Sequence, residues 1–244
     1  MKILLAPAET KLDTGDKQPI SENNFAIKSL YKKQLEVLGH YQEFIKNNEL
    51  EELSRWFGLK KIDECKKYLE PLSLKRTTKA ISRYAGVAFE ALNYSDLNRE
   101  ERIYCDNNIF IFSNLFGVVK ASDLIPDYKY KQGAKLPNIE VDVFYKKHLK
   151  NILDSYLGDE VADLRAGYYD KFYKPVAPTL TFKFIKNKKT VSHWAKYYRG
   201  IVARTMAQNN IQSLVELMDM PIAGLTLVEI KEVKNIKTLV MNID

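Results

Sequence analysis

Short runs of β-branched and aromatic residues alternate along this chain with longer segments of helical periodicity. The strand candidates are Lys2–Ala6, Ile109–Ser113, Thr179–Ile185, Leu225–Val233 and Thr238–Met241. Amphipathic helices are expected over residues 27–45 and over Val141–Leu157, because their apolar residues recur three and four positions apart. Strands interleaved with helices predict an α/β or mixed α+β fold, in which helices flank a mixed sheet.

The chain has 244 residues, of which 45% are hydrophobic and 28% charged, and no linker or repeat divides it. This length and composition predict a single compact domain over residues 1–244. The apolar runs are far shorter than the roughly 20 residues that a membrane span requires. The first apolar run breaks at Pro7, which is too early for a signal peptide. We therefore expect a cytoplasmic protein with no membrane partner.

The residues that usually bind metals or cofactors form no recognisable motif. Cys65 and Cys105 lack metal-ligand spacing, and His40, His148 and His193 are scattered. The glycine-rich signatures of dinucleotide and nucleoside-triphosphate sites are absent from the sequence, and so is the G-x-S-x-G nucleophile motif. The sequence therefore predicts no cofactor and no metal. Carboxylates such as Glu9, Asp123 and Asp127 do not by themselves identify acid–base catalysis.

The basic residues are unevenly distributed. The formal charge is +7, from 38 basic and 31 acidic residues, yet Lys171–Val215 contains nine basic residues and no acidic one. A second acid-free stretch, Pro71–Phe89, adds Lys75, Arg76, Lys79 and Arg83. Charge segregated in this way favours a positive surface that attracts nucleic acid, nucleotides or an acidic partner. The alternative is a set of solvated side chains that keep the protein soluble.

A helix is expected to begin near His193. Lys196 and Arg199 lie away from its aromatic face, beside the small residues Gly200, Ala203 and Ala207, and Arg204 lies at the border. The aromatic face is formed by Trp194, Tyr197, Tyr198, Ile201, Val202 and Thr205. Small residues beside Lys and Arg let a phosphate approach the helix. Equally, Gly200 and the alanines would suit packing against a neighbouring element.

Residues 50–70 are compatible with a helix-hairpin-helix. Leu53 and Trp56 would lie on the first helix, and Ile62 on the second, with a turn at Gly58. Such a hairpin directs backbone N–H groups at a phosphate, and Lys60 and Lys61 would strengthen that contact. The alternative is that Gly58 only ends the first helix.

Five segments, in order along the chain, resemble the YaaA-type peroxide stress proteins. The first, Leu4–Thr10, is similar to the family's S-P-A-K-T-L signature, and Arg83–Leu92 to F-x-G-D-V-Y-x-G-L. Phe112–Lys129 resembles L-S-G-L-Y-G-V-L-R-P-L-D-L-I-x-P-Y-R. Asp163–Lys171 stands where members have N-L-A-S-x-E-Y, and Trp194–Arg204 is similar to Y-A-K-x-A-R-G-L-M-A-R.

The resemblance implies a bacterial protein of the oxidative-stress response, with a positively charged cleft and a helix-hairpin-helix that binds double-stranded DNA. Lys196, Arg199, Gly200 and Arg204 match the last motif and are candidate cleft residues. A pocket is expected from Glu9, Tyr84, Asp123, Tyr128 and Lys131. Three positions depart from the family pattern: Glu9 replaces the signature lysine, Val87 an aspartate, and Lys131 an acidic residue.

Three hypotheses about function remain open at this point. The first is non-specific binding of double-stranded DNA through phosphate contacts from the basic residues. The second is an enzyme acting on a nucleotide or nucleobase, in which Lys196, Arg199 and Arg204 hold a phosphate while Tyr128 or Tyr84 stacks on the base. The third is a protein that binds an acidic partner and limits free iron or damage indirectly.

Overall fold

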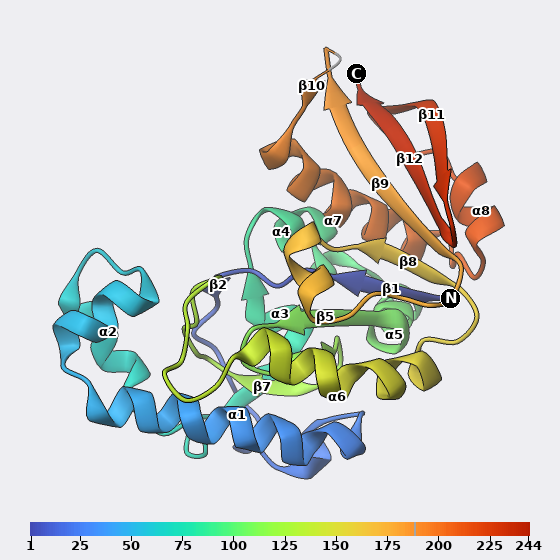
Figure 1. Cartoon of the computed structure of the whole chain (residues 1–244). Helices are drawn as coiled ribbons and strands as arrows, with labels where there is room; N and C mark the ends of the chain where they lie inside the picture. The colour runs from blue at the N-terminus through green and yellow to red at the C-terminus, as the bar shows by residue number, and fades with distance from the viewer. Residues whose placement is uncertain (188) are drawn as a thin grey trace.

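The computed structural model describes residues 1–187 and 189–244, which form one α/β domain around a mixed, mostly parallel eight-stranded sheet (Figure 1). The strands follow the order β11-β12-β9-β8-β1-β5-β6, and β10 pairs with β9. Five strands are mutually parallel: β1 (Lys2–Leu5), β5 (Ile109–Ser113), β8 (Val161–Leu164), β9 (Thr179–Lys186) and β12 (Ile236–Ile243). The antiparallel strands are β6 (Gly117–Lys120), β10 (Lys189–Thr190) and β11 (Leu225–Val233).

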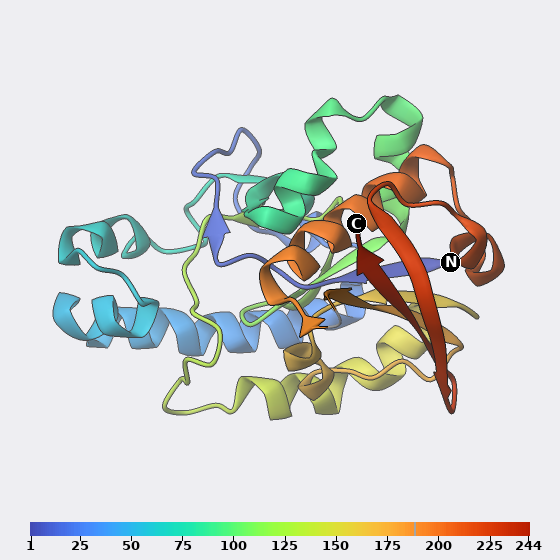
Figure 2. The same ribbon diagram turned by 90° about the horizontal axis from the view of Figure 1, so that it is seen from above.

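Helices cover both faces of this sheet. Figure 2 shows α1 (Lys28–Asn47) and α6 (Val141–Tyr156) on one side of the central strands. On the other side lie α4 (Val87–Leu92), α5 (Arg99–Asn108) and α7 (Ser192–Gln208). Because both faces are covered, every residue of β5 is buried, as is usual for central parallel strands.

The remaining elements are short. Two-stranded ladders join β2 (Thr10–Lys11) to β4 (Tyr84–Ala85) and β3 (Thr77–Lys79) to β7 (Leu124–Pro126). The short helices are α2 (Leu50–Phe57), α3 (Ala80–Arg83), α8 (Leu214–Asp219), and the 3₁₀ helices η1 (Glu22–Asn24), η2 (Ile62–Tyr68), η3 (Tyr94–Asp96) and η4 (Gly167–Lys171). Within the described residues, no helix is both long and apolar enough to cross a membrane.

The predicted fold class is confirmed, and most predicted elements are present. Ile109–Ser113 and Leu225–Val233 are strands with the expected bounds, and Leu180, Phe182 and Phe184 of β9 are buried together. The four-residue strand β8 was not predicted, because Asp163 interrupts its apolar pattern. Inside the sheet this carboxylate is paired with the guanidinium of Arg165, at 2.7 Å between Oδ2 and Nη2.

Candidate functional site

A cavity of about 370 Å³ lies where the parallel strands β1 and β8 end. Its walls come from residues 5–10 after β1, from Leu164 and Ala166 at the end of β8, from residues 85–89, and from α7. The strand that follows β1 in the sheet, β5, lies on one side of β1. On its other side lies β8, from which the chain continues to β9, so the connections diverge between β1 and β8. Ligands of open α/β sheets bind at such a switch point, outside the carboxyl ends of the strands.

Helix α7 contributes two basic side chains to the cavity wall. Lys196 is exposed and Arg199 is half-buried, and both line the cavity. Being three positions apart, they lie on the same side of the helix. Within the described residues neither forms an ion pair. Burial lowers the pKa of Arg199, and Asp163 acts in the opposite direction. The cavity edge thus presents two cationic groups that an anion can neutralise.

Gly200 has a packing role. It is buried where α7 crosses α4, and a Cβ at this position would lie 2.0 Å from the carbonyl oxygen of Ala88. This close approach of the two helices closes the route by which a phosphate would reach Gly200. The same packing gives α7 a different buried face from the one expected from the sequence, and Trp194 and Tyr197 are exposed. The buried residues of α7 are Ala195, Tyr198, Gly200, Val202, Ala203, Met206 and Ala207.

Arg204 is occupied by the protein itself. Its guanidinium donates to the carbonyl oxygens of Leu92 and Asn93, both at 3.0 Å, at the end of α4. It also forms an ion pair with Asp96 at 2.6 Å. These contacts fasten α7 to the end of α4. Arg204 therefore has a structural role in α7, and it does not line the cavity that Lys196 and Arg199 line.

Tyr84 and Tyr128 form a buried hydrogen-bonded layer, and neither side chain lines the cavity. Their hydroxyl groups lie 2.8 Å apart, and the hydroxyl of Tyr128 lies 2.8 Å from Oγ of Ser113 at the end of β5. Burial raises the pKa of Tyr84 to about 12 and also raises the pKa of Tyr128 well above its ordinary value, so both phenols are neutral at physiological pH. Their side chains are 2% and 3% exposed. The prediction that either ring stacks on a base is therefore wrong, because both faces are packed by protein.

Lys11 lies beside this tyrosine layer. Its amino nitrogen is 4.0 Å from the ring centroid of Tyr128 and donates to the carbonyl oxygens of Ala8 and Glu9, at 3.3 and 3.4 Å. Burial lowers the pKa of Lys11 to about 7, although Asp127 and Glu9 act in the opposite direction. Sequence reasoning missed this residue. The signal was its place directly after the Leu4–Thr10 block.

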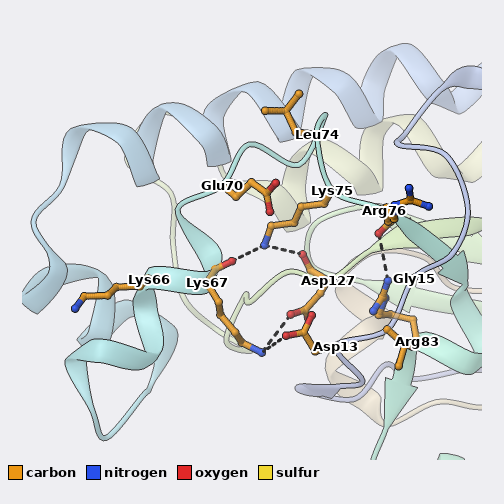
Figure 3. A pocket seen from close by; sticks show the side chains of 11 residues that line it. Asp13, Gly15, Lys66, Lys67, Glu70, Leu74, Lys75, Arg76, Arg83 and Asp127 are labelled. Carbon is orange, nitrogen blue, oxygen red and sulfur yellow. Dashed lines mark hydrogen bonds and ion pairs between the residues drawn. The ribbon is translucent and has the colours of Figure 1, made fainter.

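The basic residues of the second acid-free stretch do not join α7 at the cavity. Lys75, Arg76 and Arg83 line a different hollow, shown in Figure 3, and no residue is common to the two linings. Arg83 is 1% exposed and donates to the carbonyl oxygens of Leu12 and Ile125. Lys79 points elsewhere and forms an ion pair with Asp106. Of these four predicted phosphate ligands, only Arg76 is exposed.

Comparison with known proteins identifies relatives along nearly the whole chain. The sequence profile described as "Peroxide stress protein YaaA" matches residues 1–231. The chain belongs to the YaaA peroxide stress protein family. An uncharacterized protein of Campylobacter jejuni is 45% identical over 238 residues, which cover 97% of this chain and 96% of that protein. A UPF0246 protein of Corynebacterium glutamicum is 30% identical over 215 residues, 85% of each chain.

The YaaA signature is altered where it meets the cavity. Glu9, in place of the signature lysine, lines the cavity, and its Oε1 accepts the backbone N–H of Gln132 at 3.2 Å. Lys11 reaches back across the same turn to the carbonyl oxygen of Glu9. Thus an amino group is present at this turn, but it belongs to Lys11, two positions after the signature position that Glu9 occupies. Val87, in place of the family aspartate, also lines the cavity.

The loop that carries Lys131 and Gln132 connects the cavity to the arm. The arm comprises α2, η2 and the turn between them (residues 50–68). The side chain of Lys131 lies against Gly58, where a Cβ would be 2.8 Å from its Cδ. The next residue, Gln132, binds Glu9 at the cavity. Adjacent residues of one loop therefore touch the arm and the cavity wall. In Figure 1 the arm projects from the body at the end of the molecule to which β1 points.

The arm consists of an α-helix followed by a 3₁₀ helix. Gly58 has φ +68° and ends α2: its N–H bonds to the carbonyl of Arg55, while Leu59 N–H bonds to that of Ser54. This is a Schellman cap, so the amide of Gly58 is used within the arm. Lys60 and Lys61 are exposed in the turn. Gly58 therefore ends the first helix, which was the alternative to a phosphate-binding turn. The contact of Lys60 and Lys61 with DNA stays a prediction.

Asp123 is a structural carboxylate away from the cavity. Its two oxygens accept the backbone N–H groups of Ala26 and Lys120, each at 2.8 Å. Burial raises its pKa to about 6, and the two hydrogen bonds act against this shift. Asp123 therefore ties the segment before α1 to the turn after β6, and it does not line the cavity.

Potential metal ligands are dispersed in the part of the chain that the structure describes. In residues 1–187 and 189–244, no three His, Cys, Asp or Glu side chains gather as a metal site would require. Cys65 and Cys105 are both buried and unpaired. The absence of a bound metal stays a prediction, which elemental analysis of protein purified without chelators would test.

Proposed function

We propose that this protein binds double-stranded DNA without base-sequence selectivity, through phosphate contacts on the side of the molecule where β1 and β8 end. The observation that carries the proposal is the pair Lys196 and Arg199, which line the cavity side by side and form no ion pair within the described residues. Positive groups that lack an internal partner gain most from a phosphate, because binding releases the counterions of the DNA.

The arm supplies a second group of contacts in this proposal. Lys60 and Lys61 are exposed in its turn, and Lys131, also exposed, lies between the arm and the cavity wall. An extended polyanion that follows this edge would meet the arm, then Lys131, then Lys196. Lys75, Arg83 and Arg204 play no part, because backbone carbonyls and carboxylates already bind them. Contacts of this kind position a duplex and carry no sequence information.

The test is a fluorescence anisotropy titration with a labelled duplex of random sequence, at about 50 and about 200 mM salt. The proposal predicts saturable binding at the lower concentration and affinity that falls steeply at the higher one. A second duplex of unrelated sequence serves as the control for selectivity and should bind equally well. No detectable binding at low salt would overturn the proposal.

A second candidate is an enzyme acting on a nucleotide or another small phosphorylated molecule. The observation that favours it is the cavity volume of about 370 Å³ at the switch point, within the size range of small-molecule sites. Lys196 and Arg199 would hold the phosphate there. Saturable binding of a mononucleotide that excess duplex does not displace would favour this candidate over DNA binding.

A further inference from the structure

The cavity at the ends of β1 and β8 is larger than a phosphate group requires. Its volume is about 370 Å³, and Lys196 and Arg199 belong to the side that α7 forms. Much of the remaining wall is apolar and includes Leu5, Ala8, Val87, Phe89 and Leu164. A duplex whose phosphates meet Lys196 and Arg199 would leave this space unfilled. The space has the size and lining in which proteins enclose a small organic group.

Tyr169 places a hydroxyl group at this cavity. The side chain comes from η4, is 3% exposed and belongs to the cavity lining. No described residue forms a hydrogen bond with its hydroxyl group. The described side-chain atoms that are both unpaired and completely enclosed belong to Gln34, Asn114 and Asp127, so the hydroxyl of Tyr169 retains accessible surface. Since Tyr169 lines the cavity, this surface opens into it.

A tyrosine hydroxyl in such a buried position normally has a hydrogen-bond partner. The neighbouring tyrosines follow this rule, because Tyr84 and Tyr128 are hydrogen-bonded to each other and Tyr128 also to Ser113. Burial raises the pKa of Tyr169 well above its ordinary value, so its phenol is neutral and can donate to a ligand atom. A molecule in the cavity would supply the partner that the described residues do not.

The charges of the lining match one phosphodiester group. Among the described lining residues, the two positive charges of Lys196 and Arg199 face one negative charge, that of Glu9, which leaves a net charge of +1. An internal phosphate of a DNA strand carries one negative charge. A terminal phosphate carries about two at neutral pH. The lining therefore favours an internal nucleotide of a strand over a free mononucleotide.

We infer that the cavity encloses one nucleotide turned out of a DNA duplex, with its phosphodiester group at Lys196 and Arg199 and its sugar or base beside the hydroxyl of Tyr169. This inference rests on the proposed DNA binding and assigns a ligand to the space behind the phosphate contacts. Turning a nucleotide out costs unstacking and unpairing energy, and the cost is smallest for a nucleotide that has no partner. The protein therefore binds a duplex with one unpaired nucleotide more tightly than a fully paired duplex.

A fluorescence anisotropy competition between two duplexes tests this inference. The duplexes share one sequence, and one of them carries a single extra nucleotide in one strand. We expect the bulged duplex to bind at least about tenfold more tightly, because the cavity gives the extra nucleotide a hydrogen bond and apolar contacts. Tyr169→Phe removes only the hydroxyl group and should reduce this advantage about fivefold. Ala166→Leu at the half-buried wall fills the cavity and should abolish the advantage.

Tyr156→Phe is the matched control, because Tyr156 is an exposed tyrosine of α6 that does not line the cavity. It should keep the wild-type advantage of the bulged duplex. Ala166→Leu decides the question if Tyr169→Phe lowers stability. Equal affinity of the wild type for the two duplexes would overturn this inference and leave the proposed DNA binding intact. An advantage that both cavity variants retain would overturn it as well. Absence of binding to either duplex would overturn the DNA binding and this inference with it.

Discussion

The amino nitrogen of Lys11 lies 4.0 Å from the ring centroid of Tyr128, beneath the turn that carries Glu9. The ammonium group faces the π-system of a ring that is itself hydrogen-bonded to Ser113 and Tyr84. This contact fixes the turn between β1 and β2 against the end of β5. One wall of the cavity is therefore built on a lysine whose charge depends on pH near neutrality.

The first prediction concerns the pH dependence of this lysine. Burial lowers the pKa of Lys11 to about 7 in the folded chain, from 10.5 for an unperturbed lysine. Between these values the unfolded chain holds a proton that the folded chain lacks, so the contribution of Lys11 to stability rises with pH across this window. Urea denaturation of the wild type and of Lys11→Met at about pH 6, 8 and 9.5 measures it.

The stability difference, wild type minus Lys11→Met, should increase steadily from the lowest pH to the highest. Taking the difference removes the titration of groups that both proteins share. A difference that stays constant over the whole range would show that Lys11 titrates as an ordinary exposed lysine.

The second prediction concerns the crossing of α4 and α7. Gly200→Ala places a methyl group 2.0 Å from the carbonyl oxygen of Ala88, so the helices must separate. Overpacking of this kind should lower the free energy of unfolding by about 1–3 kcal/mol. Gly39→Ala on α1 is the control, because a Cβ there meets no atom within 4 Å. It should instead stabilise by about 0.5–1 kcal/mol through helix propensity. Equal effects of the two substitutions would contradict the packing role.

The third prediction concerns Asp123. Asp123→Asn replaces one of two acceptor oxygens by an NH₂ group, which then faces the N–H of Ala26 or Lys120. One buried amide is left unpaired, so the variant should lose about 1–3 kcal/mol of stability at neutral pH. Asp142→Asn at the half-buried start of α6 is the control, because among the described residues this carboxylate binds only the neighbouring N–H of Val143, and it should change stability by less than about 0.5 kcal/mol. A stable Asp123→Asn protein would show that these hydrogen bonds are dispensable.

The sequence predicted the elements whose pattern is local. Ile109–Ser113 and Leu225–Val233 are runs of β-branched and apolar residues with clear ends, and their bounds are those observed. Helix α7 was expected where it begins, but its orientation was not. Its buried side is decided by Gly200, which allows contact with α4, and no local pattern shows which partner a glycine meets.

The charges were the least predictable part of the site. Lys75, Arg83 and Arg204 were expected to bind phosphate because they lie in acid-free segments. In the structure they bind carbonyl oxygens or a carboxylate from segments distant along the chain, such as Ile125 for Arg83 and Asp96 for Arg204. Absence of acidic residues nearby in sequence does not exclude partners supplied by the fold. Lys196 and Arg199 remained without such partners in the described chain.

The measurement that tests the central claim most directly is the salt dependence of duplex binding by the variant Lys196→Ala with Arg199→Ala. Each phosphate neutralised contributes about −0.9 to the slope of log K against log salt, so this slope should become shallower by up to about two units. Lys146→Ala with Lys147→Ala is the matched control, because these are exposed lysines of α6 on the opposite face of the sheet. The control should keep the wild-type slope. An unchanged slope in the folded Lys196 and Arg199 variant would contradict the account.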